Sequence, residues 1–192
     1  MTHLLVVAPN WLGDAVMAQP AIADVRRAHP SARLVVAARS SVAPVFGLVP
    51  EVDEVVSLGP KPGLIAAWRD LPRTITNGRF AAALLLPNSL QSAVMVARAG
   101  VPERWGYDTD LRGRLLTRAL PRPRGVHQAA YYQRLTTSLG MPPGPLVPSL
   151  VVPDAAATAA ATLLGQHGLG GPSAPPIVGL APGAAFGGAK RW

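Results

Sequence analysis

The sequence of 192 residues contains no cysteine, which excludes disulfide bonds and metal sites built on thiolates. Histidine is scarce as well, and the histidines show no close spacing of the kind that binds zinc. They are His3, His29, His127 and His167. The sequence therefore indicates neither a metal nor another cofactor.

Long hydrophobic runs are also absent. Proline, glycine or arginine interrupts each apolar stretch before the roughly 18 residues that a membrane-spanning helix needs. The opening segment MTHLLVVAPN has no basic leader, and its apolar run is too short for a signal peptide. These features predict a soluble cytoplasmic protein.

Acidic residues are few. The chain has 10 aspartates and glutamates against 18 lysines and arginines, which gives a formal charge of +8. Such an excess predicts an anionic partner, namely phosphate, nucleic acid or a lipid surface. Aromatic residues make up only 5% of the chain and do not alternate with basic residues. Nucleic acid is therefore the least favoured of the three partners.

What the chain does contain is a series of short apolar runs that alternate with helix-like segments. Buried strands are predicted at 3–9, 32–39, 52–58, 80–87 and 177–182, and a short edge strand at 104–107. Helices are predicted at 13–30, 41–50, 63–78, 90–100, 128–140 and 155–169, and Pro20 lies either inside the first of them or at the start of its main part. Strands rich in Val, Leu and Ile that alternate with helices indicate an α/β fold with a Rossmann-like, mostly parallel sheet.

A proline-rich segment at 141–154 resembles a linker that ends a domain. We therefore predict one domain over residues 1–153. Residues 154–192 contain a linker helix and a single predicted strand, which cannot cover their own apolar faces. We expect this part to begin a second α/β domain, most of which is absent from the sequence.

A lone carboxylate follows the first predicted strand. Asp14 comes directly after Gly13 in this loop, and ligands of parallel α/β sheets bind at the carboxyl ends of the strands. The alternative is that Asp14 only caps or begins a helix. Gly13 gives a ligand room near the backbone, but the segment NWLGD lacks the G-x-G-x-x-G pattern of dinucleotide-binding folds.

The last residues form a second candidate site. The segment IVGLAPGAAFGGAKRW combines a predicted strand, a glycine-rich loop and Lys190, an arrangement suited to binding phosphate. It is not a Walker A motif, because Ala189 separates Gly188 from Lys190 and Arg191 replaces the hydroxyl residue. A flexible loop with solvated cations is the alternative.

Three separated motifs, PNWLGDAVMAQPAI, LLLPNS and PGAAFGGAKRW, occur in this order, with RWGYDTDLRGRLLT and VHQAAYYQRL between the last two. Together they resemble the lipopolysaccharide heptosyltransferases of glycosyltransferase family 9, from residue 4 to residue 192. The motifs PNWLGD and FGGAKRW are more typical of the second heptosyltransferase than of the first.

The resemblance implies a GT-B fold, in which an N-terminal domain holds the acceptor and a C-terminal domain holds ADP-heptose. It implies inverting transfer of L-glycero-D-manno-heptose to the first heptose of the lipopolysaccharide inner core, heptosyl-Kdo2-lipid A, without a metal. Asp14 matches the proposed general base, and Lys190 matches a lysine that contacts the donor phosphates. Peripheral contact with the cytoplasmic face of the inner membrane is also implied.

Further residues are candidates for substrate binding. Asn10 and Gly13 share the loop of Asp14, and we expect them at the sugar site. Asn88 and Ser89 follow the strand predicted at 80–87, either facing the same cleft or capping the next helix.

A basic segment follows RWGY and suits an acceptor that carries phosphates and carboxylates. Its arginines are Arg112, Arg114, Arg118, Arg122 and Arg124, of which we expect Arg112 and Arg114 to bind substrate. Taken one by one, such arginines are more often solvated surface charges. His127, Tyr131 and Tyr132 are predicted to be structural.

Two other functions stay open. One is a GT-B transferase for a different nucleotide sugar, because the domain that would select the donor is absent from the sequence. The other is a module that binds an anionic glycolipid without catalysis. We expect the 192 residues alone to fold and to lack efficient transfer activity.

Overall fold

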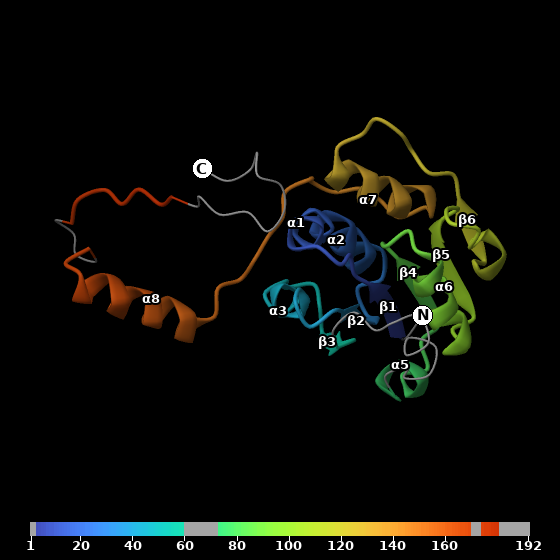
Figure 1. Ribbon diagram of the computed structural model, residues 1–192, viewed down its shortest axis with the longest axis horizontal. Helices are drawn as coiled ribbons and strands as arrows, with labels where there is room; N and C mark the ends of the chain where they lie inside the picture. Colours follow the sequence, from blue (N-terminus) through green and yellow to red (C-terminus); the bar gives the residue numbers. More distant parts are fainter. Residues whose placement is uncertain (1–2, 60–72, 170–173, 181–192) are drawn as a thin grey trace. The chain divides into compact units, whose positions relative to one another are not determined.

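The computed structural model describes residues 3–59, 73–169 and 174–180, and the chain divides into two compact units, Met1–Val151 and Val152–Trp192. The first unit contains a six-stranded sheet in the order β3-β2-β1-β4-β5-β6, and every neighbouring pair is parallel (Figure 1). The strands are β1 (His3–Val7), β2 (Arg33–Ala38), β3 (Glu54–Ser57), β4 (Ala82–Leu85), β5 (Glu103–Tyr107) and β6 (Arg118–Leu120). The predicted α/β fold with a parallel sheet is confirmed.

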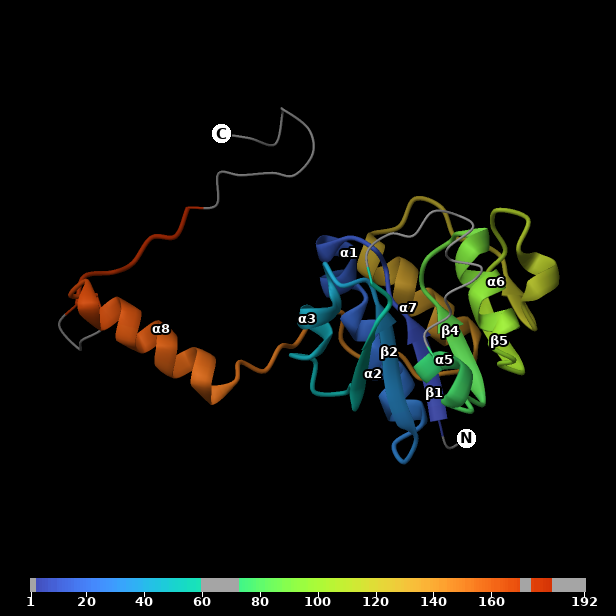
Figure 2. The same cartoon turned by 60° about the horizontal axis from the view of Figure 1, so that its bottom comes forward.

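Helices cover both faces of this sheet (Figure 2). They are α1 (Leu12–Met17), α2 (Gln19–Ala28), α3 (Ala43–Phe46), α5 (Arg73–Asn77), α6 (Leu90–Arg98), the 3-10 helix η1 (Gly113–Leu115) and α7 (Gln128–Ser138). Alternate strand residues divide between two cores. Val6 packs in the core that includes α1, α2 and α7, whereas Val7 packs in the core that includes α5 and α6. Burial on both faces explains why the strands are almost wholly apolar.

The helix predicted at 13–30 is two helices, α1 and α2, which meet at Ala18. Pro20 causes the break, because it has no N–H to continue the hydrogen bonds of α1. Pro20 lies in the first turn of α2, where a main-chain N–H has no carbonyl within the helix to bond to, so its missing N–H loses no helical hydrogen bond. The break leaves α1 as a short helix that carries Asp14.

The short strand predicted at 104–107 is confirmed as β5, but its predicted edge position is wrong, because β6 lies outside β5 and pairs Arg118 with Trp105 and Leu120 with Tyr107. β6 has only three residues and no apolar run. Its strand conformation depends on pairing with the main chain of β5, which a local sequence pattern cannot reveal.

The second unit contains α8 (Asp154–Gln166), which has no buried residue. Of the strand predicted at 177–182, the described residues 177–180 have no regular secondary structure. None of the helices in the described ranges is long and apolar enough to cross a membrane.

Asp53 provides a pH-dependent contact within the first unit. Its Oδ2 accepts hydrogen bonds from Leu34 N at 2.7 Å and from Arg26 Nη2 at 2.6 Å. Burial alone would raise the pKa of this carboxyl, but these bonds and the charges of Arg26 and Arg33 lower its pKa on balance. A lowered pKa stabilises the fold above the pKa of the unfolded chain, and this stabilisation is lost as the pH falls.

We therefore expect Asp53→Asn to be less stable than the original chain at pH 7 and to approach it as the pH falls below about 4. Urea unfolding of both proteins between pH 3 and pH 7 measures the difference. A stability difference that does not change over this range would contradict the assignment.

Candidate functional site

The centre of the sheet brings together the loops that the sequence singles out. β1 and β4 are neighbours, and Val7 pairs with Leu85 at their carboxyl ends. The connection from β1 leads to β2 on one side, whereas β4 lies on the other side, so a topological switch point lies between β1 and β4. Ligands of open α/β sheets bind at such a point. The segment with Asp14 and the segment with Asn88 follow these two strands.

Asp14 lies in the first turn of α1 and is partly buried. Trp11, and not Asp14, is the N-cap residue of α1. Burial raises the pKa of the Asp14 carboxyl, and no hydrogen bond within the described residues holds this carboxylate. A partly desolvated, unpaired carboxylate is a better proton acceptor than an ordinary surface aspartate.

Helix α1, which carries Asp14, packs against α7. Burial above all, together with the Asp14 charge, raises the pKa of Tyr132. The next residue toward the N-terminus, Tyr131, contacts Asn88: Asn88 Nδ2 donates to the Tyr131 hydroxyl at 2.8 Å. Helix α7 therefore connects the loop after β1 with the loop after β4.

Asn10 and Gly13 lie exposed beside Asp14. The Oδ1 of Asn10 accepts a hydrogen bond from Arg39 Nε at 2.6 Å. Sequence analysis missed Arg39, although its place directly after β2 signals the same edge of the sheet. A Cβ at Gly13 would meet nothing within 4 Å, so the packing of the described residues does not require glycine at this position.

Ser89 caps helix α6, because its hydroxyl accepts a hydrogen bond from Ser92 N at 3.4 Å. The capping alternative is thus confirmed for Ser89. Asn88 instead lines a pocket of about 660 Å³ at the carboxyl edge of the sheet. The other lining residues include Asp108, Thr109, Arg122, Arg124 and Tyr131.

Two of the predicted arginines, Arg122 and Arg124, line this pocket. The Arg122 guanidinium lies over the ring of Tyr131 at 5.8 Å from its centroid, which fixes the cation beside Asn88. Tyr131 packs against Tyr107, as the structural prediction requires, and its hydroxyl also reaches the pocket. Asp14 is not among the lining residues.

The structure corrects the prediction that Arg112 binds substrate. Its side chain is fully buried at 0% exposure, and its guanidinium donates to main-chain carbonyls of the neighbouring loops. Arg114 and Arg118 are exposed but do not line the pocket. Arg118 lies over Trp105, 5.7 Å from the ring centroid.

His127 is the N-cap residue of α7, and its Nδ1 accepts a hydrogen bond from Ala129 N at 3.3 Å. The predicted structural role of His127 is confirmed. Lys190 lies outside the described residues. Within those residues, no group of three or more His, Cys, Asp or Glu side chains is placed to hold a metal ion.

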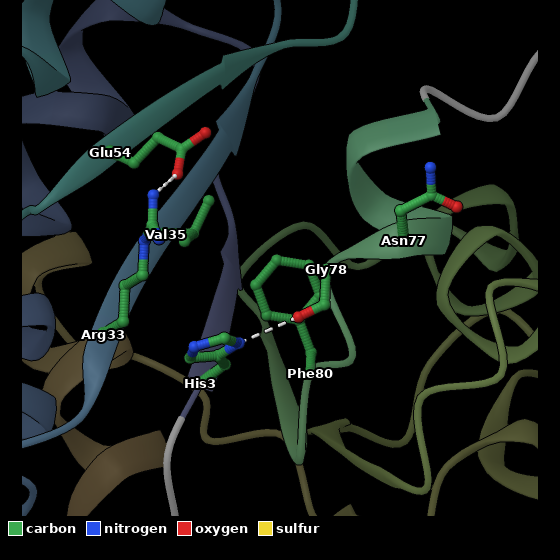
Figure 3. A pocket seen from close by; sticks show the side chains of 7 residues that line it. All are labelled: His3, Arg33, Val35, Glu54, Asn77, Gly78 and Phe80. Atoms are coloured by element: carbon green, nitrogen blue, oxygen red, sulfur yellow. Dashed lines mark hydrogen bonds and ion pairs between the residues drawn. The ribbon is translucent and has the colours of Figure 1, made fainter.

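A second cavity, of about 300 Å³, lies at the opposite edge of the sheet (Figure 3). Four of its lining residues are already bonded in pairs: Arg33 Nη2 pairs with Glu54 Oε2 at 2.6 Å, and His3 Nδ1 lies 3.0 Å from Gly78 O. The amino edge of a parallel sheet is also not where ligands of this fold class bind. The pocket at the carboxyl edge is therefore the stronger candidate site.

Comparisons with known proteins agree with this architecture. A model of glycosyltransferase family 9 (heptosyltransferase) matches residues 68–192. The lipopolysaccharide heptosyltransferase 2 of Escherichia coli is 30% identical over 200 residues, covering 98% of this chain and 56% of that protein. The lipooligosaccharide heptosyltransferase 2 of Haemophilus influenzae is 27% identical over 199 residues, covering 99% of this chain and 57% of that protein. The chain thus spans just over half the length of these relatives.

Solved structures give the same result. The E. coli ADP-heptose lps heptosyltransferase II matches with a TM-score of 0.72 at 29% identity, covering 100% of this chain and 57% of that chain. A family 9 glycosyl transferase from Veillonella parvula matches with a TM-score of 0.77 at 19% identity, covering 88% of this chain and 50% of that chain. The second likeness concerns the fold alone.

Proposed function

Because the chain belongs to glycosyltransferase family 9, we propose that it forms the acceptor-binding half of a heptosyltransferase that acts in lipopolysaccharide synthesis. The donor is ADP-heptose, and the acceptor is the first heptose of the inner core on Kdo2-lipid A. The name of the solved E. coli structure supports ADP-heptose as the donor, and the name of the E. coli relative supports lipopolysaccharide as the class of acceptor. The activity belongs to a protein of the relatives' full length, since this chain spans 56% of the E. coli relative.

The proposal rests on two features at the carboxyl edge of the same sheet. One is the partly buried carboxylate of Asp14, which has no hydrogen bond within the described residues, and the other is the pocket lined by Arg122 and Arg124. In the proposed step, an acceptor hydroxyl oxygen attacks the anomeric carbon of heptose and the bond to ADP breaks. The hydroxyl proton passes to Asp14, and inversion follows from attack opposite the leaving group. The raised pKa of Asp14 suits this transfer, because it brings the base closer to the working pH.

Charge that develops on the departing ADP is stabilised by a nearby cation. We assign this role to Lys190, in the glycine-rich segment FGGAKRW. Backbone N–H groups of such a segment are suited to the same diphosphate. No metal is required in this scheme.

Acceptor recognition falls to Arg122 and Arg124, with Asn88 between them and the centre of the sheet. Guanidinium groups bind the carboxylates of Kdo and the phosphates of lipid A through paired hydrogen bonds. Asn10, Gly13 and Arg114 are exposed at the same edge or on its loops, and we propose them as additional contacts.

The direct test is a transfer assay with a protein that continues beyond Trp192 to the length of the relatives. Radiolabelled or mass-resolved heptose transfer from ADP-heptose to heptosyl-Kdo2-lipid A is expected, with UDP- and GDP-sugars as competing donors. Transfer from another nucleotide sugar alone would assign a different transferase. Acceptor binding without any transfer would identify a glycolipid-binding module.

For acceptor recognition, we expect Arg122→Gln and Arg124→Gln each to weaken binding of heptosyl-Kdo2-lipid A by about tenfold, because each removes one charge-assisted contact. Calorimetry on the 192-residue chain with acceptor in detergent micelles measures the affinity. Arg118→Gln is the matched control, since Arg118 is exposed outside the pocket. Equal losses in all three variants would show a general charge effect and not a site.

A further inference from the structure

We propose that Arg112 is a positioning residue, whose buried guanidinium holds the turn Pro87–Ser89 so that Asn88 faces the acceptor pocket. The inference rests on the proposed function only for the identity of the ligand in that pocket. The effect of the buried Arg112 cation on the direction of the Asn88 side chain does not depend on which ligand binds in the pocket.

The contacts of Arg112 join two loops at the carboxyl edge. Its Nε donates to Tyr107 O at 2.9 Å, at the end of β5. Its Nη1 donates to Pro87 O and lies 3.4 Å from Ser89 O, and both carbonyls belong to the turn after β4. The same nitrogen is 3.2 Å from Ser92 Oγ in α6.

These contacts enclose Asn88 from both sides. Arg112 binds the carbonyl of the residue before Asn88 and that of the residue after it. The carbonyl of Asn88 itself accepts a hydrogen bond from Thr109 Oγ1 at 2.8 Å. With three successive carbonyls held, the main chain fixes where the Asn88 amide leaves the turn. The amide then meets the Tyr131 hydroxyl at the pocket wall.

The buried position of Arg112 is an unfavourable place for a cation. Arg112 has no ion pair within the described residues, and its Nη2 has no hydrogen-bond partner there. A charge buried against main-chain carbonyls and the Ser92 hydroxyl, without an ion pair, is costly, and an apolar side chain of similar size would fill the space at a lower cost in free energy. Gly106 makes room for the group, because a Cβ there would lie 3.0 Å from Arg112 Nη2. An arrangement that costs stability and fixes geometry fits a positioning role.

Arg104 offers a matched control. It lies on β5, the strand that precedes the loop of Arg112, and its guanidinium also binds main-chain carbonyls: Leu115 O at 2.6 Å, Val101 O at 2.6 Å and Pro102 O at 3.1 Å. None of these groups lines the acceptor pocket. Loss of Arg104 thus reproduces the loss of a carbonyl-binding arginine without touching the turn of Asn88.

The experiment compares Arg112→Met, Arg112→Lys, Arg104→Met and Asn88→Ala in the 192-residue chain. Each variant is titrated with heptosyl-Kdo2-lipid A in micelles at a temperature where thermal melting shows it folded. We expect Arg112→Met to weaken binding about tenfold or more, as a misplaced contact residue does. Arg112→Lys should recover part of the loss, and Arg104→Met should stay within about twofold of the original chain. Adding Asn88→Ala to Arg112→Met should cause little further loss, because both changes remove the same contact.

A second readout needs no ligand. The side-chain amide of Asn88 and the backbone amides of residues 87–92 are followed by NMR and hydrogen exchange. In Arg112→Met, we expect the Asn88 amide signal to shift and protection to fall in this segment alone. Additive binding losses, or an unchanged Asn88 signal, would overturn the proposal. Failure of the original chain to bind the acceptor would instead count against the proposed function, while the NMR result still decides the role of Arg112.

Discussion

Replacing Asp14 by asparagine is expected to lower kcat for heptosyl transfer by about 10²- to 10⁴-fold, the usual contribution of a general base. Asparagine has nearly the same shape but cannot accept the acceptor's proton. Acceptor affinity should hardly change, because asparagine keeps a side-chain oxygen that can accept a hydrogen bond from the acceptor hydroxyl. Initial rates at saturating ADP-heptose and acceptor, in the protein of full length, measure the effect.

The melting temperature and the pH dependence of the rate distinguish a general base at Asp14 from an acid that only stabilises the start of helix α1. Burial raises the pKa of Asp14, so the ionised group costs folding free energy at pH 7, and its replacement should not lower the melting temperature. The rate should fall as the pH drops through the raised pKa of Asp14, and the variant should lack this acidic limb. Asp110→Asn is the control, since Asp110 is an exposed acid in the loop after β5. A destabilised variant with normal kcat would assign Asp14 to the helix alone.

Removing the carboxylate of Asp24 is expected to destabilise the first unit by about 3 kcal/mol, as loss of a buried charged acceptor does. Asp24 is fully buried at 0% exposure. It accepts hydrogen bonds from Arg27, from Thr136 Oγ1 at 3.1 Å and from Gly144 N at 2.9 Å. It thereby joins α2, α7 and the segment after α7, and Asp24→Ala leaves buried donors without an acceptor.

Urea unfolding of Asp24→Ala measures this loss. Arg27→Met should cost less, because Arg27 is 42% exposed and its pair is screened by water. Thr136→Val removes one donor to Asp24, and its loss of stability should lie between those of Asp24→Ala and Arg27→Met. If Asp24→Ala lowers the free energy of unfolding by less than about 1 kcal/mol, or by no more than Arg27→Met does, the hydrogen bonds to Asp24 are not what stabilises this contact.

The architecture of the first unit follows from local patterns. Runs such as LLVV after His3 and LVVAA after Arg33 are apolar on both faces, and only strands covered by helices on both sides need this pattern. The parallel sheet and the location of Asp14 at a strand's carboxyl end are consequences of that pattern. β6 was not predicted, because three residues that include a charged arginine and precede a proline form a strand only when β5 offers main-chain partners.

The burial of individual arginines in the basic segment could not be predicted from the sequence. Arg112 and Arg122 lie ten positions apart in one basic segment and look equivalent in the sequence. One is buried against carbonyls and the other lies over Tyr131 at the pocket. Charge patterning records how many cations a segment has, but burial depends on which loops pack around each of them.

The alternation of strands and helices, the excess of positive charge and the acidic group after the first strand can all be predicted from the order of the residues. These are properties of residues close together in the chain, where periodicity and turn chemistry act. Three other features require the packed fold: Asn88 contacts Tyr131 across 43 positions, Arg112 is buried against carbonyls of the neighbouring loops, and Arg122 and Arg124 line one pocket. Such contacts depend on strand order and helix packing, which bring distant residues together without a trace in the local pattern.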